Sequence, residues 1–117
     1  MSIDNRRAPR FRDFARARLD ELCHMSGYLE DISLHGCRVR FPHSFEIDTD
    51  QEYTLSILPT LRSGLREFSL RVQPQWTEAS ADSIEIGFCV LPSPGIQLYG
   101  RYVELLSRLE VEQLQEA

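Results

Sequence analysis

Apolar and polar side chains alternate along most of the chain before Pro92. A period of two is typical of β-strands that have one buried and one exposed face. We predict six such strands, separated by turn residues such as glycine, proline and serine. The predicted strands cover residues 15–20, 28–32, 37–41, 53–57, 68–77 and 84–90.

The fifth predicted strand is the longest and contains a proline. Pro74 has no N–H to donate to a neighbouring strand, so we expect it at a bulge or on an edge. Beyond Pro74 the alternation continues, with Trp76 in the same set as Leu70 and Val72. The sequence therefore predicts that Trp76 lies on the apolar face of this strand.

The pattern changes after the segment Pro92-Ser93-Pro94-Gly95. Apolar residues then recur with a period of about 3.6, which predicts an amphipathic helix of roughly four to five turns. These residues are Leu98, Tyr102, Leu105 and Leu109, with Leu106 alongside. We expect this apolar stripe either to pack against the end of the sheet or to pair with a second copy in a homodimer.

The six strands also predict how the sheet is completed. An open antiparallel sheet leaves two edges with unpaired backbone groups, and closure into a barrel removes them. The sequence therefore predicts a mainly β protein built on a six-stranded antiparallel barrel. With 117 residues the chain has the length of one domain. Within it we expect an extended arginine-rich arm over residues 1–14, the barrel over 15–92 and the helix over 93–117.

Composition is that of an ordinary soluble globular protein, with 42% hydrophobic and 26% charged residues. No apolar run is long enough to cross a bilayer, and the polar, basic N-terminus lacks the apolar core of a signal peptide. We therefore expect a cytoplasmic protein that does not insert into membranes. Cys23, Cys37 and Cys89 are odd in number and lack Cys-x-x-Cys spacing, so we expect neither a disulfide nor a metal site.

Charge is unevenly distributed along the chain. The net charge of −5 argues against general nucleic-acid binding. Residues 1–18 nevertheless contain six arginines against Asp4 and Asp13. All thirteen cations of the chain are arginine, and the planar fork of arginine suits phosphates and guanine edges. Two plainer interpretations stay open, a GC-rich genome and a basic tail that is merely solvated.

The spacing Asp31-x-Ser33-x-x-Gly36 lies where the second predicted strand ends and the third begins. Asp31 can only accept hydrogen bonds, and Ser33 can donate or accept them. Gly36 lacks the Cβ that would keep a ligand or another backbone at a distance. The three residues could form one rim of a small-ligand site. The alternative is an ordinary turn, in which Asp and Ser bond their own backbone.

A second motif lies upstream, where Arg6 and Arg10 form an Arg-x-x-x-Arg pair. The interval between Arg10 and Asp31 is long enough for one strand and a hairpin. In this order and spacing, the two motifs together resemble the signature of the PilZ domain. The resemblance implies a six-stranded barrel with a C-terminal helix that covers nearly the whole chain. It also implies a receptor for cyclic di-GMP, a bacterial second messenger with two guanines and two phosphates. We expect no cofactor besides this ligand.

The resemblance assigns expected roles to individual residues. The guanidinium groups of Arg6 and Arg10 would pair with a guanine O6/N7 edge or with phosphate, and Arg7 could add a third contact. Asp31 would accept hydrogen bonds from guanine N1 and N2. The two remaining residues of the proposed site are Ser33, which would bond phosphate or hold the loop, and Gly36, which would allow close approach.

The mechanism that we expect is a conformational switch. Ligand binding would fold the basic arm over the barrel rim and present a changed surface to an unidentified downstream protein. The resemblance alone implies processes such as motility and biofilm formation. One alternative is an adaptor of the same fold that binds protein but no nucleotide. Another is a small nucleic-acid-binding barrel, which the acidic remainder of the chain disfavours.

Enzymatic activity is the function class with the least support. No nucleophile, base and orienting group recur at a recognisable spacing, and there is no phosphate-cradling glycine loop. Asp31, Ser33 and His35 have the residue types of a catalytic triad, but neighbours of this kind are usually incidental. We therefore expect a binding protein.

Overall fold

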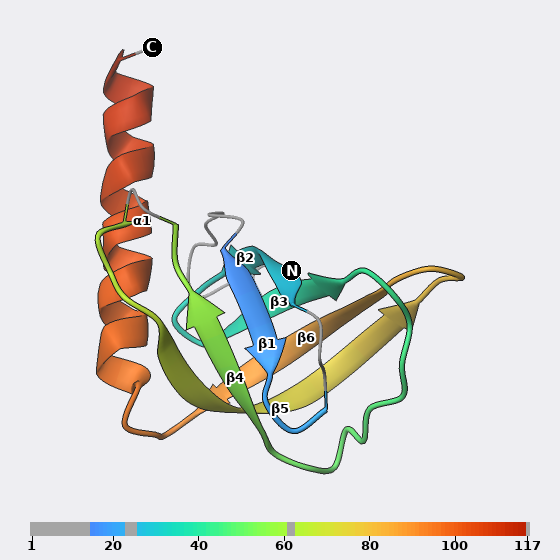
Figure 1. The fold of residues 1–117 in the computed structure, drawn as a ribbon. Coiled ribbons are helices and arrows are strands. Elements are labelled where there is room, and N and C mark those ends of the chain that lie inside the picture. Colours follow the sequence, from blue (N-terminus) through green and yellow to red (C-terminus); the bar gives the residue numbers. More distant parts are fainter. Residues whose placement is uncertain (1–14, 23–25, 61–62, 117) are drawn as a thin grey trace, which may run out of the picture.

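Six antiparallel strands close into a barrel, and one helix lies beside it (Figure 1). The computed structural model describes residues 15–22, 26–60 and 63–116. Its elements are β1 (Arg16–Leu19), β2 (Gly27–Ile32), β3 (Gly36–Phe41), β4 (Tyr53–Leu58), β5 (Phe68–Ala79), β6 (Ile84–Leu91) and α1 (Ile96–Glu116). The order around the barrel is β1-β2-β3-β6-β5-β4. The predicted barrel and C-terminal helix are confirmed, whereas the predicted arm lies outside the described residues.

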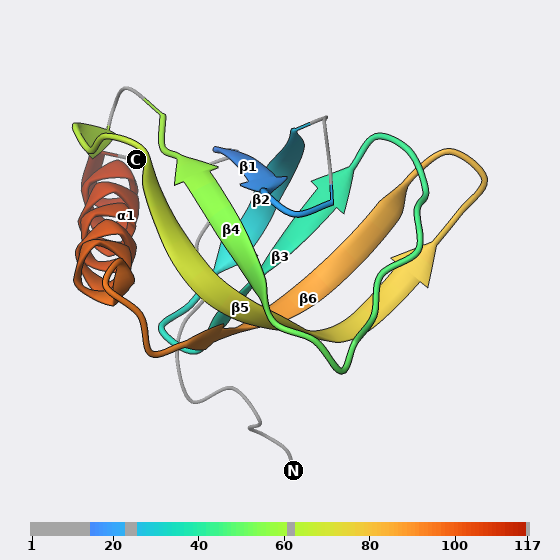
Figure 2. The same cartoon turned by 60° about the horizontal axis from the view of Figure 1, so that its bottom comes forward.

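The barrel interior is filled by the apolar residues of the alternating pattern. Burial of each such side chain contributes about 1.5–3 kcal/mol. Figure 2 shows the strands wrapping around this interior with α1 against one side. Fully buried residues come from all six strands and include Leu19, Leu29, Val39, Leu55, Val72 and Ile86.

Helix α1 packs against the barrel through its N-terminal half. Tyr99, Tyr102, Val103 and Leu106 are buried, and the ring of Tyr102 meets Phe68 of β5 edge-on with centroids 6.0 Å apart. The helix thus packs on the barrel as expected, but of the predicted stripe only Tyr102 and the accompanying Leu106 are fully buried, and Leu98 and Leu109 are half-buried against the core. Pairing with a second copy stays a prediction. In the described part of the chain, no helix combines the length and the hydropathy needed to cross a bilayer.

A β-bulge in β2 changes the direction of Asp31. Leu29 pairs with Val39 of β3, but the register then shifts so that Asp31 pairs with Arg38 and Ile32 with Cys37. Leu29 and Ile32 are both fully buried although they are three residues apart. The extra residue at the bulge therefore turns Asp31 toward the outer side of the barrel, where it is 8% exposed and lies against Arg38. Unbroken alternation would have put it beside Leu29 in the core.

A second bulge lies in β5 between Pro74 and Trp76. Its position confirms the expectation that Pro74 lies at a bulge or an edge. The expectation that Trp76 belongs to the apolar, inward-facing set is wrong, because its side chain is 43% exposed. The inserted residue shifts the alternation by one position, so Trp76 lies on the outer face of the barrel.

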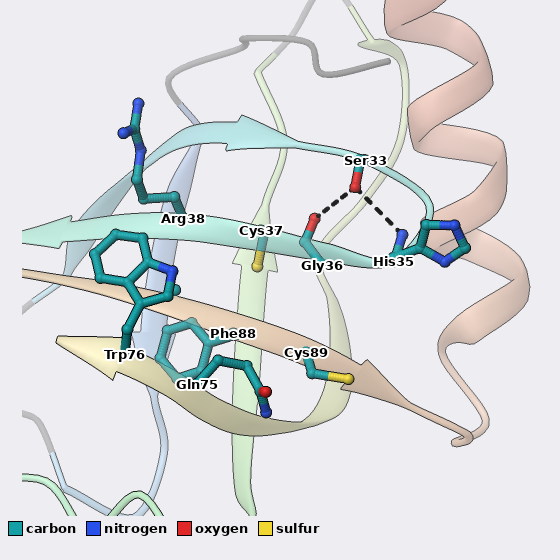
Figure 3. A pocket seen from close by; sticks show the side chains of 10 residues that line it. Ser33, His35, Gly36, Cys37, Arg38, Gln75, Trp76, Phe88 and Cys89 are labelled. Carbon is teal, nitrogen blue, oxygen red and sulfur yellow. Dashed lines mark hydrogen bonds between the residues drawn. The ribbon is translucent and has the colours of Figure 1, made fainter. Parts of the chain in front are cut away.

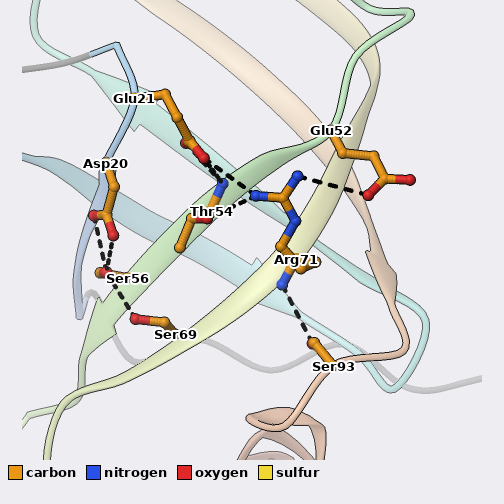
Figure 4. Close-up of polar contacts among 8 residues, drawn as sticks. All are labelled: Asp20, Glu21, Glu52, Thr54, Ser56, Ser69, Arg71 and Ser93. Atoms are coloured by element: carbon orange, nitrogen blue, oxygen red, sulfur yellow. Dashed lines mark hydrogen bonds and ion pairs between the residues drawn. The ribbon is translucent and has the colours of Figure 1, made fainter.

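Strand β1 is short and is held in place partly by polar contacts (Figure 4). Just beyond its end, the carboxylate of Asp20 accepts a hydrogen bond from Ser56 Oγ at 2.9 Å. The Glu21 carboxylate accepts hydrogen bonds from the Thr54 N–H at 2.8 Å and from Arg71 Nη1 at 3.2 Å. These contacts tie the chain after β1 to β4 and β5.

This network lowers the pKa of Glu21. Partial burial raises the pKa, but the hydrogen bonds from Thr54 and the contact with Arg71 outweigh it. A carboxylate whose pKa is lower in the folded state adds stability above its unfolded-state pKa and loses it as pH falls through the folded-state pKa. Stability contributed by Glu21 should therefore be present at neutral pH and absent in strong acid.

We expect Glu21→Gln to lower the free energy of unfolding at about pH 7 by less than about 1 kcal/mol, because an exposed ion pair is screened by solvent. The loss should be smaller at about pH 2.5, because the stability from the charged carboxylate disappears as pH falls through its lowered pKa. Urea unfolding at both pH values measures it. Glu46→Gln, which removes the same charge from an exposed loop, serves as the control. An equal loss at both pH values would contradict the electrostatic explanation.

Candidate functional site

Four residues form one row across the outer face of the barrel. Asp31 of β2 pairs with Arg38 of β3, Arg38 pairs with Gly87 of β6, and Gly87 pairs with Trp76 of β5. Side chains of directly paired residues on one face of a sheet are close neighbours. The two bulges thus bring a carboxylate and an indole into one row with a guanidinium between them.

Arg38 is the central side chain of this row. Its Nη2 lies 3.0 Å from Asp31 Oδ2, and its Nε lies 3.7 Å from Glu30 Oε1. The Nε atom is buried and makes no hydrogen bond within the described part of the chain. Since a buried donor without an acceptor is costly, this N–H is suited to an acceptor supplied by a ligand.

Arg40 forms a second set of ion pairs next to the row. Arg40 Nε lies 2.8 Å from Glu30 Oε2, and Arg40 Nη2 lies 2.7 Å from Glu85 Oε2. A hydrogen bond with Glu85 lowers the pKa of Glu30, whereas the hydrogen bond with Glu30 and partial burial raise the pKa of Glu85. Arg40 thus lies between two carboxylates whose pKa values are shifted in opposite directions, next to Arg38.

Gly87 and Trp76 form the other end of the row. A Cβ at position 87 would come within 3.0 Å of three atoms of the Trp76 indole. The absence of a side chain therefore lets the indole lie across β6 toward Arg38, as Figure 3 shows. Because its other face remains open to solvent, Trp76 offers a flat aromatic surface for stacking.

The turn between β2 and β3 carries Ser33. Its Oγ accepts a hydrogen bond from the His35 N–H at 3.3 Å, and its own N–H donates to the Gly36 carbonyl oxygen at 2.9 Å. The hydroxyl of Tyr99 in α1 donates to the carbonyl oxygens of Ser33 at 2.7 Å and Gly36 at 2.8 Å. Ser33 thus bonds the backbone of its own turn, as the ordinary-turn alternative expected, whereas Asp31 pairs with the side chain of Arg38. The turn is also attached to the helix.

Gly36 is required by a neighbouring strand. A Cβ on Gly36 would lie within 3.0 Å of the carbonyl oxygen of Phe88 in β6. The sequence offered two reasons for a glycine here, close approach of a ligand and close approach of another backbone. The structure shows the close approach of another backbone. A direct contact between Gly36 and a ligand stays a prediction.

An open pocket of about 280 Å³ lies between this turn and strands β5 and β6 (Figure 3). Its wall includes Arg38 but not Asp31, which is the next residue of the row. Residues that line it include Ser33, Gly36, Arg38, Gln75, Trp76 and Cys89. The pocket combines a hydroxyl, a guanidinium and an indole, which suits a planar base with polar edges.

The structure places only part of the predicted site. It brings Ser33 and Gly36 to the pocket and Asp31 to the adjacent row, whereas Arg6, Arg7 and Arg10 lie outside the described residues. Arg38 and Trp76 were missed as candidates. Arg38 could have been suspected as an arginine two residues beyond Gly36, but the position of Trp76 depends on the bulge. Within the described ranges, no group of three His, Cys, Asp or Glu residues could hold a metal ion.

Comparison with known families gives one match that covers most of the chain. Residues 4–105 match the model of the PilZ domain. Curated protein sequences give no match. The family match includes both predicted motifs and all six strands, so it concerns the same residues as the row and the pocket.

Solved structures show the same fold at low sequence identity. The PilZ domain of YcgR from Escherichia coli, solved with c-di-GMP, is 15% identical with a TM-score of 0.71, covering 97% of this chain and all of that one. The MrkH–c-di-GMP complex from K. pneumonia is 16% identical with a TM-score of 0.72, covering 98% and 56%. The inhibitor of motility MotI/DgrA from Bacillus subtilis is 14% identical with a TM-score of 0.70, covering 98% and 54%. The chain thus spans about half the length of the latter two.

Proposed function

Because the chain belongs to the PilZ domain family, we propose that it is a receptor for cyclic di-GMP. The observation that carries this proposal is the row Asp31–Arg38–Gly87–Trp76 beside the Ser33 turn. A guanine has a flat face, one edge with acceptors and one edge with donors. The row offers a partner for each of these features on neighbouring strands.

Each side chain has a distinct task in this proposal. Asp31 accepts hydrogen bonds from guanine N1 and N2, so an adenine, which has an acceptor at N1, is rejected. Arg38 donates from its guanidinium N–H groups to guanine O6 and N7 or to a phosphate oxygen. Trp76 stacks on the base, and Ser33 bonds phosphate or holds the turn.

The predicted arm completes the site. Arg6 and Arg10, with Arg7 as a further contact, bind a guanine O6/N7 edge or the phosphates. Residues 1–14 thus act as the ligand-binding arm of a domain whose barrel spans 15–92 and whose helix spans 93–117. Arginine is well suited to this task because its fork makes two parallel hydrogen bonds with one acceptor pair.

Ligand binding acts as a switch in this proposal. The ligand bridges the arm to the barrel, and the changed surface is recognised by a downstream protein in the cytoplasm. Two structural relatives, one bound to c-di-GMP and one an inhibitor of motility, extend well beyond the part that this chain matches. Motility control and biofilm formation are outputs that fit this family.

We expect the purified chain to bind cyclic di-GMP but neither cyclic di-AMP nor GTP, as measured by isothermal titration calorimetry. Trp76 is the sole tryptophan, so stacking of a guanine should also change the tryptophan emission during the same titration. Arg10→Ala should weaken binding at least about tenfold through loss of a charge-assisted contact.

Arg66→Ala is the matched control for the arm. Arg66 belongs to another Arg-x-x-x-Arg spacing, is exposed, and does not line the pocket. Its replacement removes the same charge and should leave the affinity unchanged. A folded wild-type chain that gives neither heat nor a change in emission would overturn the receptor proposal and favour a nucleotide-independent adaptor.

A further inference from the structure

Tyr99 connects helix α1 to the turn between β2 and β3. The residue is only 1% exposed, and its hydroxyl lies 2.7 Å from the Ser33 carbonyl oxygen and 2.8 Å from that of Gly36. One hydroxyl hydrogen is therefore shared between two backbone acceptors at the two ends of the turn. The contact spans elements that are far apart in sequence.

We propose that Tyr99 is a positioning residue for the ligand site, through which ligand binding and the packing of α1 are energetically coupled. This inference rests on the proposed receptor function, which supplies cyclic di-GMP as the ligand. It adds the contact through which helix α1 responds to ligand binding. The turn that Tyr99 holds directly follows Asp31 and carries Ser33. A change in the shape of the turn therefore changes the direction of both groups toward the ligand.

The turn depends on Tyr99 because it has few other attachments in the described part of the chain. Ser33 bonds within the turn, its N–H donating to the Gly36 carbonyl at 2.9 Å and its Oγ accepting from the His35 N–H at 3.3 Å. Toward β6, the Val90 N–H donates to the His35 carbonyl at 3.1 Å, and Gly36 pairs with Cys89. Leu34 is 57% exposed and packs little. Without the Tyr99 hydroxyl, the Gly36 carbonyl would keep the Ser33 N–H as its donor, but the Ser33 carbonyl would lose the Tyr99 donor. A buried carbonyl that loses its donor carries a free-energy penalty, so the turn should relax toward solvent.

The helix end of the contact is firmly packed. The Tyr99 N–H donates to the Gly95 carbonyl at 3.0 Å in the first turn of α1, and Tyr102, Val103 and Leu106 of the same helix are buried against the barrel. A shift of the turn is therefore passed to a rigid helix. By thermodynamic reciprocity, a protein that binds the exposed side of α1 would change the affinity for the ligand by the same factor.

Tyr99→Phe tests the proposal, with Tyr102→Phe as the matched control. Both tyrosines are buried in α1, but the Tyr102 ring packs edge-on against Phe68 of β5, whereas the Tyr99 hydroxyl bonds the turn. We expect Tyr99→Phe to weaken cyclic di-GMP binding by about tenfold, within the 5- to 150-fold range typical of coupled sites. Tyr102→Phe should change the affinity less than about twofold. Both are titrated at a temperature where each variant is fully folded.

Hydrogen exchange on the ligand-free chain gives a second readout. The Ser33 and Val90 amides should exchange faster in Tyr99→Phe than in Tyr102→Phe, because only the first variant releases the turn. Equal exchange in the two variants would overturn the proposal whether or not the ligand binds. If Tyr99→Phe exchanges faster but binds the ligand with wild-type affinity, the coupling is overturned. If the wild-type chain does not bind cyclic di-GMP, the receptor function is refuted and this coupling with it.

Discussion

Asp31→Ala should weaken cyclic di-GMP binding by at least about 100-fold, which corresponds to about 2.7 kcal/mol. In the proposed complex, the Asp31 carboxylate accepts two hydrogen bonds from one guanine, and hydrogen bonds to a charged group contribute about 1.5–3 kcal/mol each. The substitution also removes the partner that lies 3.0 Å from Arg38 Nη2. The guanidinium then loses its fixed orientation beside the pocket.

Calorimetry on Asp31→Ala and Asp82→Ala measures this effect with a control for net charge. Asp82 lies exposed at the tip of the β5–β6 hairpin and does not line the pocket beside the row. Asp82→Ala should bind like the wild type. The barrel should survive Asp31→Ala, since Glu30 remains near Arg38 Nε at 3.7 Å. Binding of Asp31→Ala within threefold of the wild type would show that Asp31 does not contact the guanine.

Gly36→Ala should lower the free energy of unfolding by about 2–4 kcal/mol, close to the upper range for overpacking. The added Cβ would lie within 3.0 Å of the Phe88 carbonyl oxygen, which is backbone and cannot rotate away. Strands β3 and β6 pair from Gly36 to Phe41, so relief of the clash must separate them at this end. Urea unfolding of the ligand-free chain measures the loss.

Gly100→Ala provides a control of opposite sign. Gly100 lies inside α1, and a Cβ there would meet nothing within 4 Å. Alanine at this position should raise the free energy of unfolding by about 0.5–1 kcal/mol, because it restricts the unfolded chain and favours the helix. If Gly36→Ala instead unfolds like the wild type but no longer binds ligand, then Gly36 serves the ligand and not the strand contact.

Local pattern predicted most of the architecture. The period-two alternation located all six strands, and the change to a period near 3.6 after Gly95 located α1. The bulge at Pro74 was also predictable, because proline lacks the N–H that a continuous ladder requires. These features depend on side-chain chemistry within a few residues, so the order of the residues is sufficient to predict them.

The composition of the site was less predictable. Asp31, Ser33 and Gly36 could be selected from their spacing, and the structure places them in one region. Arg38 and Trp76 could not be selected in the same way. The position of Trp76 was predicted on the wrong face, because alternation was continued across a bulge whose extra residue reverses it.

The sequence by itself determined a β-barrel with a C-terminal helix and a turn rich in polar groups, because period and turn chemistry are local properties. Only the tertiary structure decided that Asp31 and Trp76 point outward into one row, that Gly36 meets Phe88, and that Tyr99 holds the turn. The physical reason is that the direction of a strand residue follows from its pairing register with another strand. That register depends on partners distant in sequence.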